Sequence, residues 1–93
     1  MHQKGGYAAA EPLFREALEG RRETLGSRHP GTLTSIGNLG MLHMAKGNLA
    51  AAELLLREAL EGLRETLGDE HPDTLLSIDK LDQLLQEQGD FAD

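Results

Sequence analysis

The 93-residue sequence contains no cysteine and no tryptophan, and it has only one tyrosine and two phenylalanines. Without cysteine there is neither a disulfide framework nor thiolate chemistry, and the composition fits a reducing compartment, so we expect a cytoplasmic protein. No apolar run approaches the length of a membrane span, and the first 25 residues lack the apolar core of a signal peptide. A chain of this size forms one small domain with a modest core.

Basic residues are also scarce, because 9 lysines and arginines stand against 16 acidic residues, for a formal charge of −7. A nucleic-acid binder needs a basic face that displaces counterions, so the charge argues against this class of protein and we expect no nucleic-acid partner. The same charge disfavours binding to anionic membrane surfaces. The apolar residues are mainly leucine and alanine, which favour helix over strand. The composition therefore predicts an all-α protein.

One long phrase occurs twice in the sequence. The stretch "AEPLFREALEGRRETLGSRHPGTL" begins at Ala10, and "AELLLREALEGLRETLGDEHPDTL" begins at Ala52, at an offset of 42 residues. With this offset, about 27 of 47 aligned pairs are identical, and such self-similarity at a fixed period indicates a repeat architecture. We expect a single domain, 1–93, made of a partial unit 1–28, a full unit 29–70 and a partial unit 71–93.

The apolar residues recur at the i, i+3, i+4 spacing of one helical face, and this spacing predicts four helices. Their expected ranges are 7–25, 30–46, 49–67 and 72–88, and a further helix is expected to begin near Phe91 after a turn at "QGDF". Pro12 falls inside the first range, which predicts a kink there or a late start. Short loops make consecutive helices antiparallel neighbours.

Small residues at the expected helix crossings resemble the tetratricopeptide repeat (TPR) pattern. The full unit carries it at Leu39, Gly40, Gly47, Leu49, Ala52, Leu56 and Ala59, and the first unit at Tyr7, Ala10, Phe14 and Ala17. Gly40 is expected to face Ala52 and to let two backbones approach. The 42-residue period is longer than the usual 34. With "REAL" and "HP.TL", it is similar to the kinesin light chain class, and the resemblance covers the chain.

The resemblance implies a right-handed TPR-like α-solenoid of helical hairpins that binds a peptide or protein in its concave groove, without catalysis or a cofactor. Asn38 occupies the place where such repeats often carry an asparagine that bonds a peptide backbone. Methionines would add adaptable apolar contacts. The expected groove residues are Thr34, Asn38, Met41, Met44, Lys80 and Gln83. The alternative is that these residues only line a solvated groove.

Histidines and carboxylates give no independent sign of a metal or catalytic site. His29 and His71 occupy the same turn position one repeat apart, about 10 Å by helix packing distance, whereas zinc ligands lie near 2.1 Å from the metal. We expect each histidine to order its own turn. No Ser–His–Asp order or phosphate loop is present, and "GNLG" at 37–40 falls within a helix.

The two ends of the chain depart from the repeat pattern. Asp82 replaces the small residue found at Gly40, and the polar positions around it resemble the cap that terminal repeats need. The first helix is expected to lack part of its cover, which would leave an apolar face for docking at Leu13, Phe14 and Leu18. The leading hypothesis is a protein-interaction module that uses its groove. The alternative is a structural subunit that docks, or forms a homo-oligomer, through its terminal helices.

Overall fold

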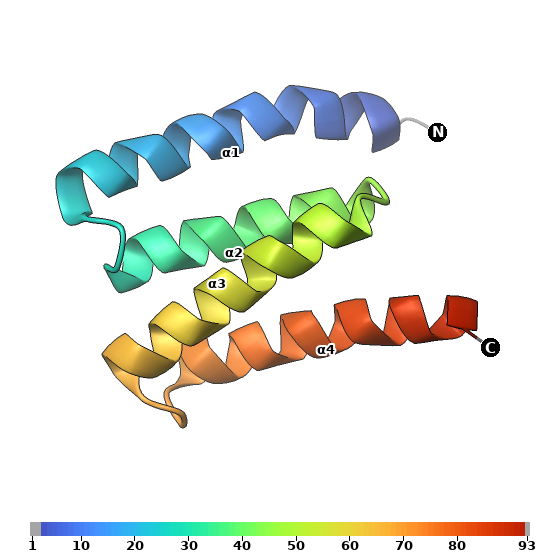
Figure 1. Cartoon of the computed structure of the whole chain (residues 1–93). Helices are drawn as coiled ribbons and strands as arrows, with labels where there is room; N and C mark the ends of the chain where they lie inside the picture. Colours follow the sequence, from blue (N-terminus) through green and yellow to red (C-terminus); the bar gives the residue numbers. More distant parts are fainter. Residues whose placement is uncertain (1–2, 93) are drawn as a thin grey trace.

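The chain folds into four helices connected by short turns (Figure 1). The computed structural model describes the backbone of residues 3–92 and the side-chain environments of residues 6–89. The helices are α1 (Gln3–Leu25), α2 (Pro30–Ala45), α3 (Leu49–Leu67) and α4 (Pro72–Ala92). Consecutive helices run in opposite directions, α1 packs on α2, and α3 packs on both α2 and α4. The predicted all-α hairpin solenoid is confirmed.

Two equivalent turns show why the words "RHPGTL" and "EHPDTL" are repeated. Gly26 and Gly68 both have φ 95°, a left-handed conformation that glycine adopts without strain. The ring nitrogen Nδ1 of His29 then accepts a hydrogen bond from the Gly31 backbone N–H at 2.9 Å. His71 caps α4 in the same way through the Asp73 N–H at 3.0 Å. The expectation that each histidine orders its own turn is confirmed.

A threonine in each turn fastens the new helix to the one before it. Thr32 and Thr74 are both fully buried. The hydroxyl of Thr32 donates to the Arg21 carbonyl at 3.2 Å, and that of Thr74 donates to the Leu63 carbonyl at 3.3 Å. A buried hydroxyl requires such a partner, so these bonds help fix the angle at which each helix leaves its turn.

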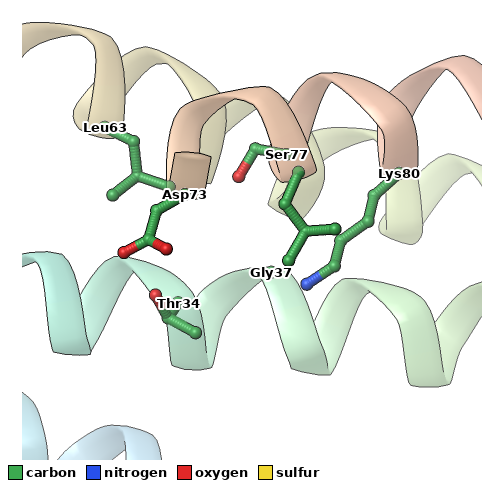
Figure 2. Close-up of a pocket in the computed structure, with 7 residues that line it drawn as sticks. Thr34, Gly37, Leu63, Asp73, Ser77 and Lys80 are labelled. Atoms are coloured by element: carbon green, nitrogen blue, oxygen red, sulfur yellow. The ribbon is translucent and has the colours of Figure 1, made fainter. Parts of the chain in front are cut away.

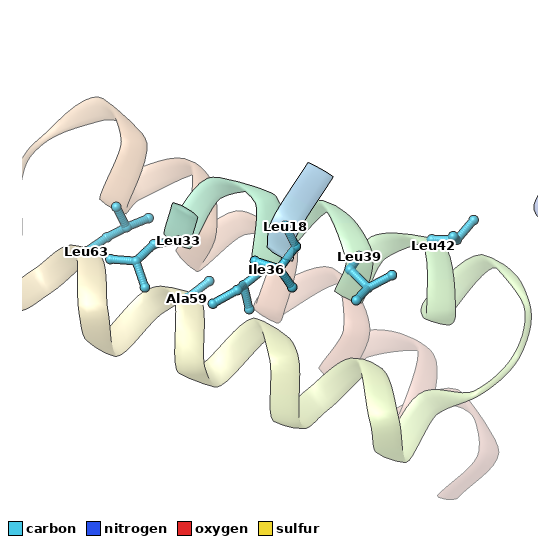
Figure 3. Close-up of a cluster of buried hydrophobic side chains, with 7 residues drawn as sticks. All are labelled: Leu18, Leu33, Ile36, Leu39, Leu42, Ala59 and Leu63. Atoms are coloured by element: carbon cyan, nitrogen blue, oxygen red, sulfur yellow. The ribbon is translucent and has the colours of Figure 1, made fainter. Parts of the chain in front are cut away.

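Leucines form two core clusters between the helices. The first joins α1, α2 and α3 (Figure 3) and consists of Leu18, Leu33, Ile36, Leu39, Leu42, Ala59 and Leu63. The second joins α2, α3 and α4 and consists of Met44, Ala52, Leu56, Leu60, Leu81 and Leu84. Burying one such leucine side chain contributes about 1.5–3 kcal/mol relative to exposure. The two clusters share α2 and α3, so the central pair of helices carries most of the core.

The close approach of α2 and α3 depends on glycine, although not in the expected pairing. A Cβ at Gly40 would lie 3.0 Å from atoms of Leu56 and 3.2 Å from the Cβ of Leu55, and Ala52 is not among its nearest neighbours. A Cβ at Gly62 would lie 2.6 Å from the Leu33 side chain. The side chains closest to Gly40 are therefore leucines one turn further along α3 than Ala52, the residue expected to face it.

Two predicted helix ends also differ from the structure. Helix α1 begins by Gln3 and continues through Pro12, so the late start is wrong. Proline leaves the carbonyl four residues earlier without a partner, but Ala8 is exposed and its carbonyl can bond to water.

Helix α4 continues through Gly89 to Ala92, so the predicted turn at 88–91 is wrong; Asp93 lies outside the described residues. The true turn at Gly47 is held by the Asn48 N–H, which donates to the His43 carbonyl at 2.8 Å, and by a 3.4 Å contact between their side chains. In α4 the position that corresponds to His43 is Leu85, which cannot form the polar side-chain contact.

Candidate functional site

Helices α2 and α4 lie side by side and enclose a small hollow on one face of the solenoid (Figure 2). Thr34 and Gly37 line it from α2, and α4 contributes Asp73, Ser77 and Lys80. Its volume is about 40 Å³, whereas pockets for small molecules typically measure 300–1,000 Å³. This hollow has room for ordered water or the tip of one side chain, and it is too small to enclose a substrate.

Asn38 lies next to this hollow and is exposed. Its Oδ1 accepts a hydrogen bond from Lys80 Nζ at 3.4 Å, and the same lysine nitrogen lies 3.8 Å from the place of a Cβ on Gly37. With its oxygen held by Lys80, the Asn38 amide presents N–H donors, which suit a backbone carbonyl.

A wider hollow lies on the other side of Asn38, between α1 and α2. Its volume is about 150 Å³, and it is lined by Phe14, Ala17, Arg21, Ser35 and Asn38. Arg21 Nη1 donates to Ser35 Oγ at 2.9 Å, which holds the guanidinium at the wall. The structure thus joins Phe14 and Asn38, which the sequence analysis assigned to separate surfaces, into one continuous depression.

The predicted groove residues fall into two groups. Thr34 lines the small hollow, and Lys80 lies between that hollow and Asn38. Gln83 is exposed but lines neither of these hollows. Met41 is half-buried against the second core cluster. Met44 is only 9 % exposed and packs in that cluster, so its assignment to the groove is wrong: side chains of α3 and α4 cover it.

The predicted docking face of α1 is exposed for only part of its length. Leu13 is 64 % exposed and Phe14 is 37 % exposed. Leu18 is 5 % exposed and packs in the first core cluster. Its assignment to the docking face is wrong, because Leu18 lies on the side of α1 that faces α2. The sequence analysis did not assign Arg21 to a site. Its sequence signal was that arginine replaces the leucine found at the corresponding position, Leu63.

Glu11 of α1 and Glu53 of α3 occupy the same repeat position and form equivalent ion pairs. Glu11 bonds Lys46 and Arg15 and lies 3.8 Å from the His43 ring. The hydrogen bond from Lys46, and then that from Arg15, lowers the pKa of Glu11. Glu53 accepts from Arg57 at 2.9 Å and from Gln88 at 3.4 Å, and the Arg57 bond is the main cause that lowers the pKa of Glu53. The arginine pairs lie within one helix, whereas the bonds from Lys46 to Glu11 and from Gln88 to Glu53 join neighbouring helices.

The described residues contain no group of three or more His, Cys, Asp or Glu side chains that could hold a metal ion. Nδ1 of His29 and Nδ1 of His71 already accept the capping hydrogen bonds. Within the described part of the chain, no helix is both long enough and apolar enough to cross a bilayer.

Antiparallel helical hairpins that repeat at a fixed period and expose a row of polar side chains beside α2 define an α-solenoid repeat protein. The chain belongs to the tetratricopeptide repeat family, because the model of that family matches residues 1–65 and 37–93. Repeats of this family generally mediate protein–protein interaction and are non-catalytic. No curated protein matches the sequence of this chain.

Proposed function

We propose that the chain is a protein-interaction module that holds a peptide or protein segment along the depression beside Asn38. The observation that supports this most directly is the donor capacity of Asn38 between two hollows, of about 40 Å³ and 150 Å³. An extended segment would place a backbone carbonyl at Asn38 and an apolar side chain against Phe14 and Ala17. Aromatic residues such as Phe14 contribute much of the binding energy at protein interfaces.

The flanking charges indicate which segments would bind. Arg21 lies at the wall of the wider hollow, and Lys80 bonds Asn38. These two cations lie on a chain whose formal charge is −7, so they would favour a segment with at least one acidic residue near its apolar anchor. Such complementarity gives specificity and on-rate more than affinity.

A selection from a random peptide display library, followed by titration of the selected peptides, tests this proposal. Asn38→Ala should weaken a selected peptide by about tenfold, which corresponds to one interface hydrogen bond. Glu58→Ala changes an exposed residue of α3 and serves as the matched control, with unchanged affinity. If the selected peptides bind Asn38→Ala and Glu58→Ala with the same affinity as the original chain, the proposed place of binding is contradicted.

The exposed face of α1 supports a second candidate function, that of a subunit that docks or self-associates through its terminal helices. Leu13 and Phe14 expose more than a third of their surface, and adjacent exposed apolar side chains mark interaction surfaces. Because Phe14 also lines the wider hollow, substitution of Phe14 alone does not separate the two functions.

We also infer a closer relation to the kinesin light chain class within the family. The offset of 42 residues between the N-terminal prolines of α2 and α4, Pro30 and Pro72, supports this inference, since the usual period is 34. The experimental structure of a longer array with this period would test whether its hairpins have the same lengths and turns.

A further inference from the structure

The packing of α2 on α3 provides an internal template for the uncovered faces of α1 and α4. With the 42-residue offset, α4 corresponds to α2, and α1 corresponds to α3. Among the described helices, α1 contacts only α2. Helix α2 packs on the helix before it and on the helix after it, whereas α4 packs on α3 before it and has no described helix after it. The chain therefore exposes one half of the α2–α3 interface on α4 and the other half on α1.

A matched knob and hole remain at these two faces. Within the chain, Leu33 of α2 packs over Gly62 of α3, so closely that a Cβ there would lie 2.6 Å from the leucine. The corresponding residues are Leu75 on α4, which is 47 % exposed, and Gly20 on α1, which has nothing within 4 Å of its would-be Cβ. Glycine in a helix interior is destabilising relative to alanine, and no contact among the described residues requires it at position 20.

The Phe14 side chain of α1 has a complementary hollow at the other end of the molecule. A hollow of about 310 Å³ lies beside α4 and is lined by Ile78, Leu81, Asp82 and Leu85 together with residues of α3. In the template, Leu56 packs against Gly40, and these positions correspond to Phe14 and Asp82. The same register therefore directs Phe14 into this hollow, where Leu85 is 41 % exposed.

Charge at the two faces is complementary at one pair of positions. Gly37 and Leu63 line one hollow within the chain, so the residues at the corresponding positions, Asp79 and Arg21, would line one hollow at the new contact. Both are exposed. Two pairs of positions are mismatched. Asp82 stands where Gly40 allows a separation of only 3.0 Å from Leu56. Glu70 and Glu23 stand where Arg28 and Glu65 form an ion pair within the chain, so two like charges would meet there.

We propose that α4 of one copy packs on α1 of a second copy, in the register in which α2 packs on α3. This inference deepens the second of the functions proposed above and does not depend on ligand binding in the groove. The contact is heterologous, since each copy uses one face as knob and another as hole, and such contacts propagate into chains of subunits. The carboxylate of Asp82 weakens the contact and keeps the assembly dependent on concentration.

Sedimentation of the 93-residue chain tests whether the contact forms. We expect the average mass to rise between about 10 µM and 1 mM and to pass that of a dimer, because every complex retains a free face at each end. A chain that remains monomeric up to about 1 mM would overturn the proposal, and so would an assembly that stops at two copies.

Two variants that each damage one face test the polarity of the contact. Gly20→Gln fills the hole on α1, and Leu75→Glu removes the knob on α4; each should weaken self-association by at least about tenfold. An equimolar mixture should form a heterodimer and nothing larger, since only one intact pair of faces remains. A Leu75→Glu chain that still associates with itself would indicate an α1–α1 contact and overturn the proposal.

Controls separate the contact from folding. Nothing lies within 4 Å of the Gly20 Cβ position, so Gly20→Gln should retain its helical circular dichroism and its thermal transition. Leu54 is 73 % exposed on α3, outside the proposed contact, and Leu54→Gln should associate like the original chain. Loss of assembly in Leu54→Gln would point to non-specific apolar aggregation and overturn the proposed register.

A gain-of-function variant provides the sharpest test of the register. Asp82→Gly restores the small residue found at Gly40 and should tighten self-association by about tenfold. Unchanged or weaker association would show that Asp82 does not lie opposite Phe14. Peptide binding can be titrated on the monomeric Gly20→Gln chain, so failure of the groove proposal would be observed separately from failure of this one.

Discussion

Helices α1 and α3 share most of their sequence yet differ in which of their faces are buried. Leu18 and Leu60 correspond to each other, and they are 5 % and 6 % exposed. Phe14 and Leu56 also correspond, but Phe14 is 37 % exposed and Leu56 only 1 %. The first pair lies on the side that faces the following helix, which both α1 and α3 possess. Leu56 packs against Gly40 of α2 and in the second core cluster, whereas Phe14 has no described helix at the place of Gly40 and lines only the hollow between α1 and α2.

The comparison shows that a repeat sequence specifies two packing faces, whereas burial depends on the neighbour that each face receives. Glu11 and Glu53 make the same point for polar contacts. Both bond the arginine four residues later, but Glu11 also bonds Lys46, whereas Glu53 bonds the neutral Gln88 at the corresponding position. Similar sequences therefore form similar helices, but the contacts that stabilise these helices differ.

The largest expected difference is between two large apolar residues at the same repeat position. Leu56→Ala should lower the free energy of unfolding by about 2–5 kcal/mol, because it leaves a cavity in the second core cluster. Phe14→Ala should cost about 1 kcal/mol, since the ring is already partly exposed and less transfer free energy is lost. Urea denaturation followed by circular dichroism at low micromolar concentration measures both. Equal losses would contradict the assigned difference in cover.

The two equivalent glycines should respond in opposite directions. Gly62→Ala forces a methyl group against Leu33, whose atoms lie 2.6 Å from the new Cβ position, and overpacking of this kind costs about 1–3 kcal/mol. Gly20→Ala meets nothing within 4 Å and should stabilise the chain by about 0.5–1 kcal/mol through helix propensity. The same denaturation experiment applies, and a destabilising Gly20→Ala would show that α1 is covered in solution.

Sequence alone predicted the four helices and most of their ends, because leucine periodicity, Pro30 and Pro72 act locally. It did not predict the burial of Met44 or Leu18, which depends on the angle at which neighbouring helices pack. Nor did it predict that Phe14 and Asn38 line one hollow, since they lie on different helices. The predicted turn at 88–91 was wrong, because a glycine such as Gly89 ends a helix only where a residue such as His43 stabilises the turn that follows.

The histidine caps of the two turns should contribute equally, in contrast to the core residues. His29→Ala and His71→Ala each remove the acceptor for one backbone N–H at the start of a helix. Loss of a cap costs about 0.5–2 kcal/mol, and we expect both variants to fall near 1 kcal/mol. Thermal unfolding of the two single variants checks this. A much smaller effect of His71→Ala would indicate that the first turn of α4 frays before the molecule unfolds.

The smallest expected effect is a difference in acid sensitivity between Glu11 and Glu53. Both side chains have a pKa below the ordinary value of 4.5 in the folded chain, so each contributes stability that is present above about pH 4.5 and is lost as the pH falls through the lowered pKa. Glu11 bonds two cations and Glu53 bonds one, so Glu11→Gln should flatten the acid decline of the urea midpoint between about pH 5 and 3 more than Glu53→Gln does. Added salt should narrow the difference, because exposed ion pairs are screened. Identical pH profiles for the two variants would show that Lys46 does not hold Glu11 in solution, and that the charged link between α1 and α2 adds nothing to the contacts that α1 already makes through Leu18.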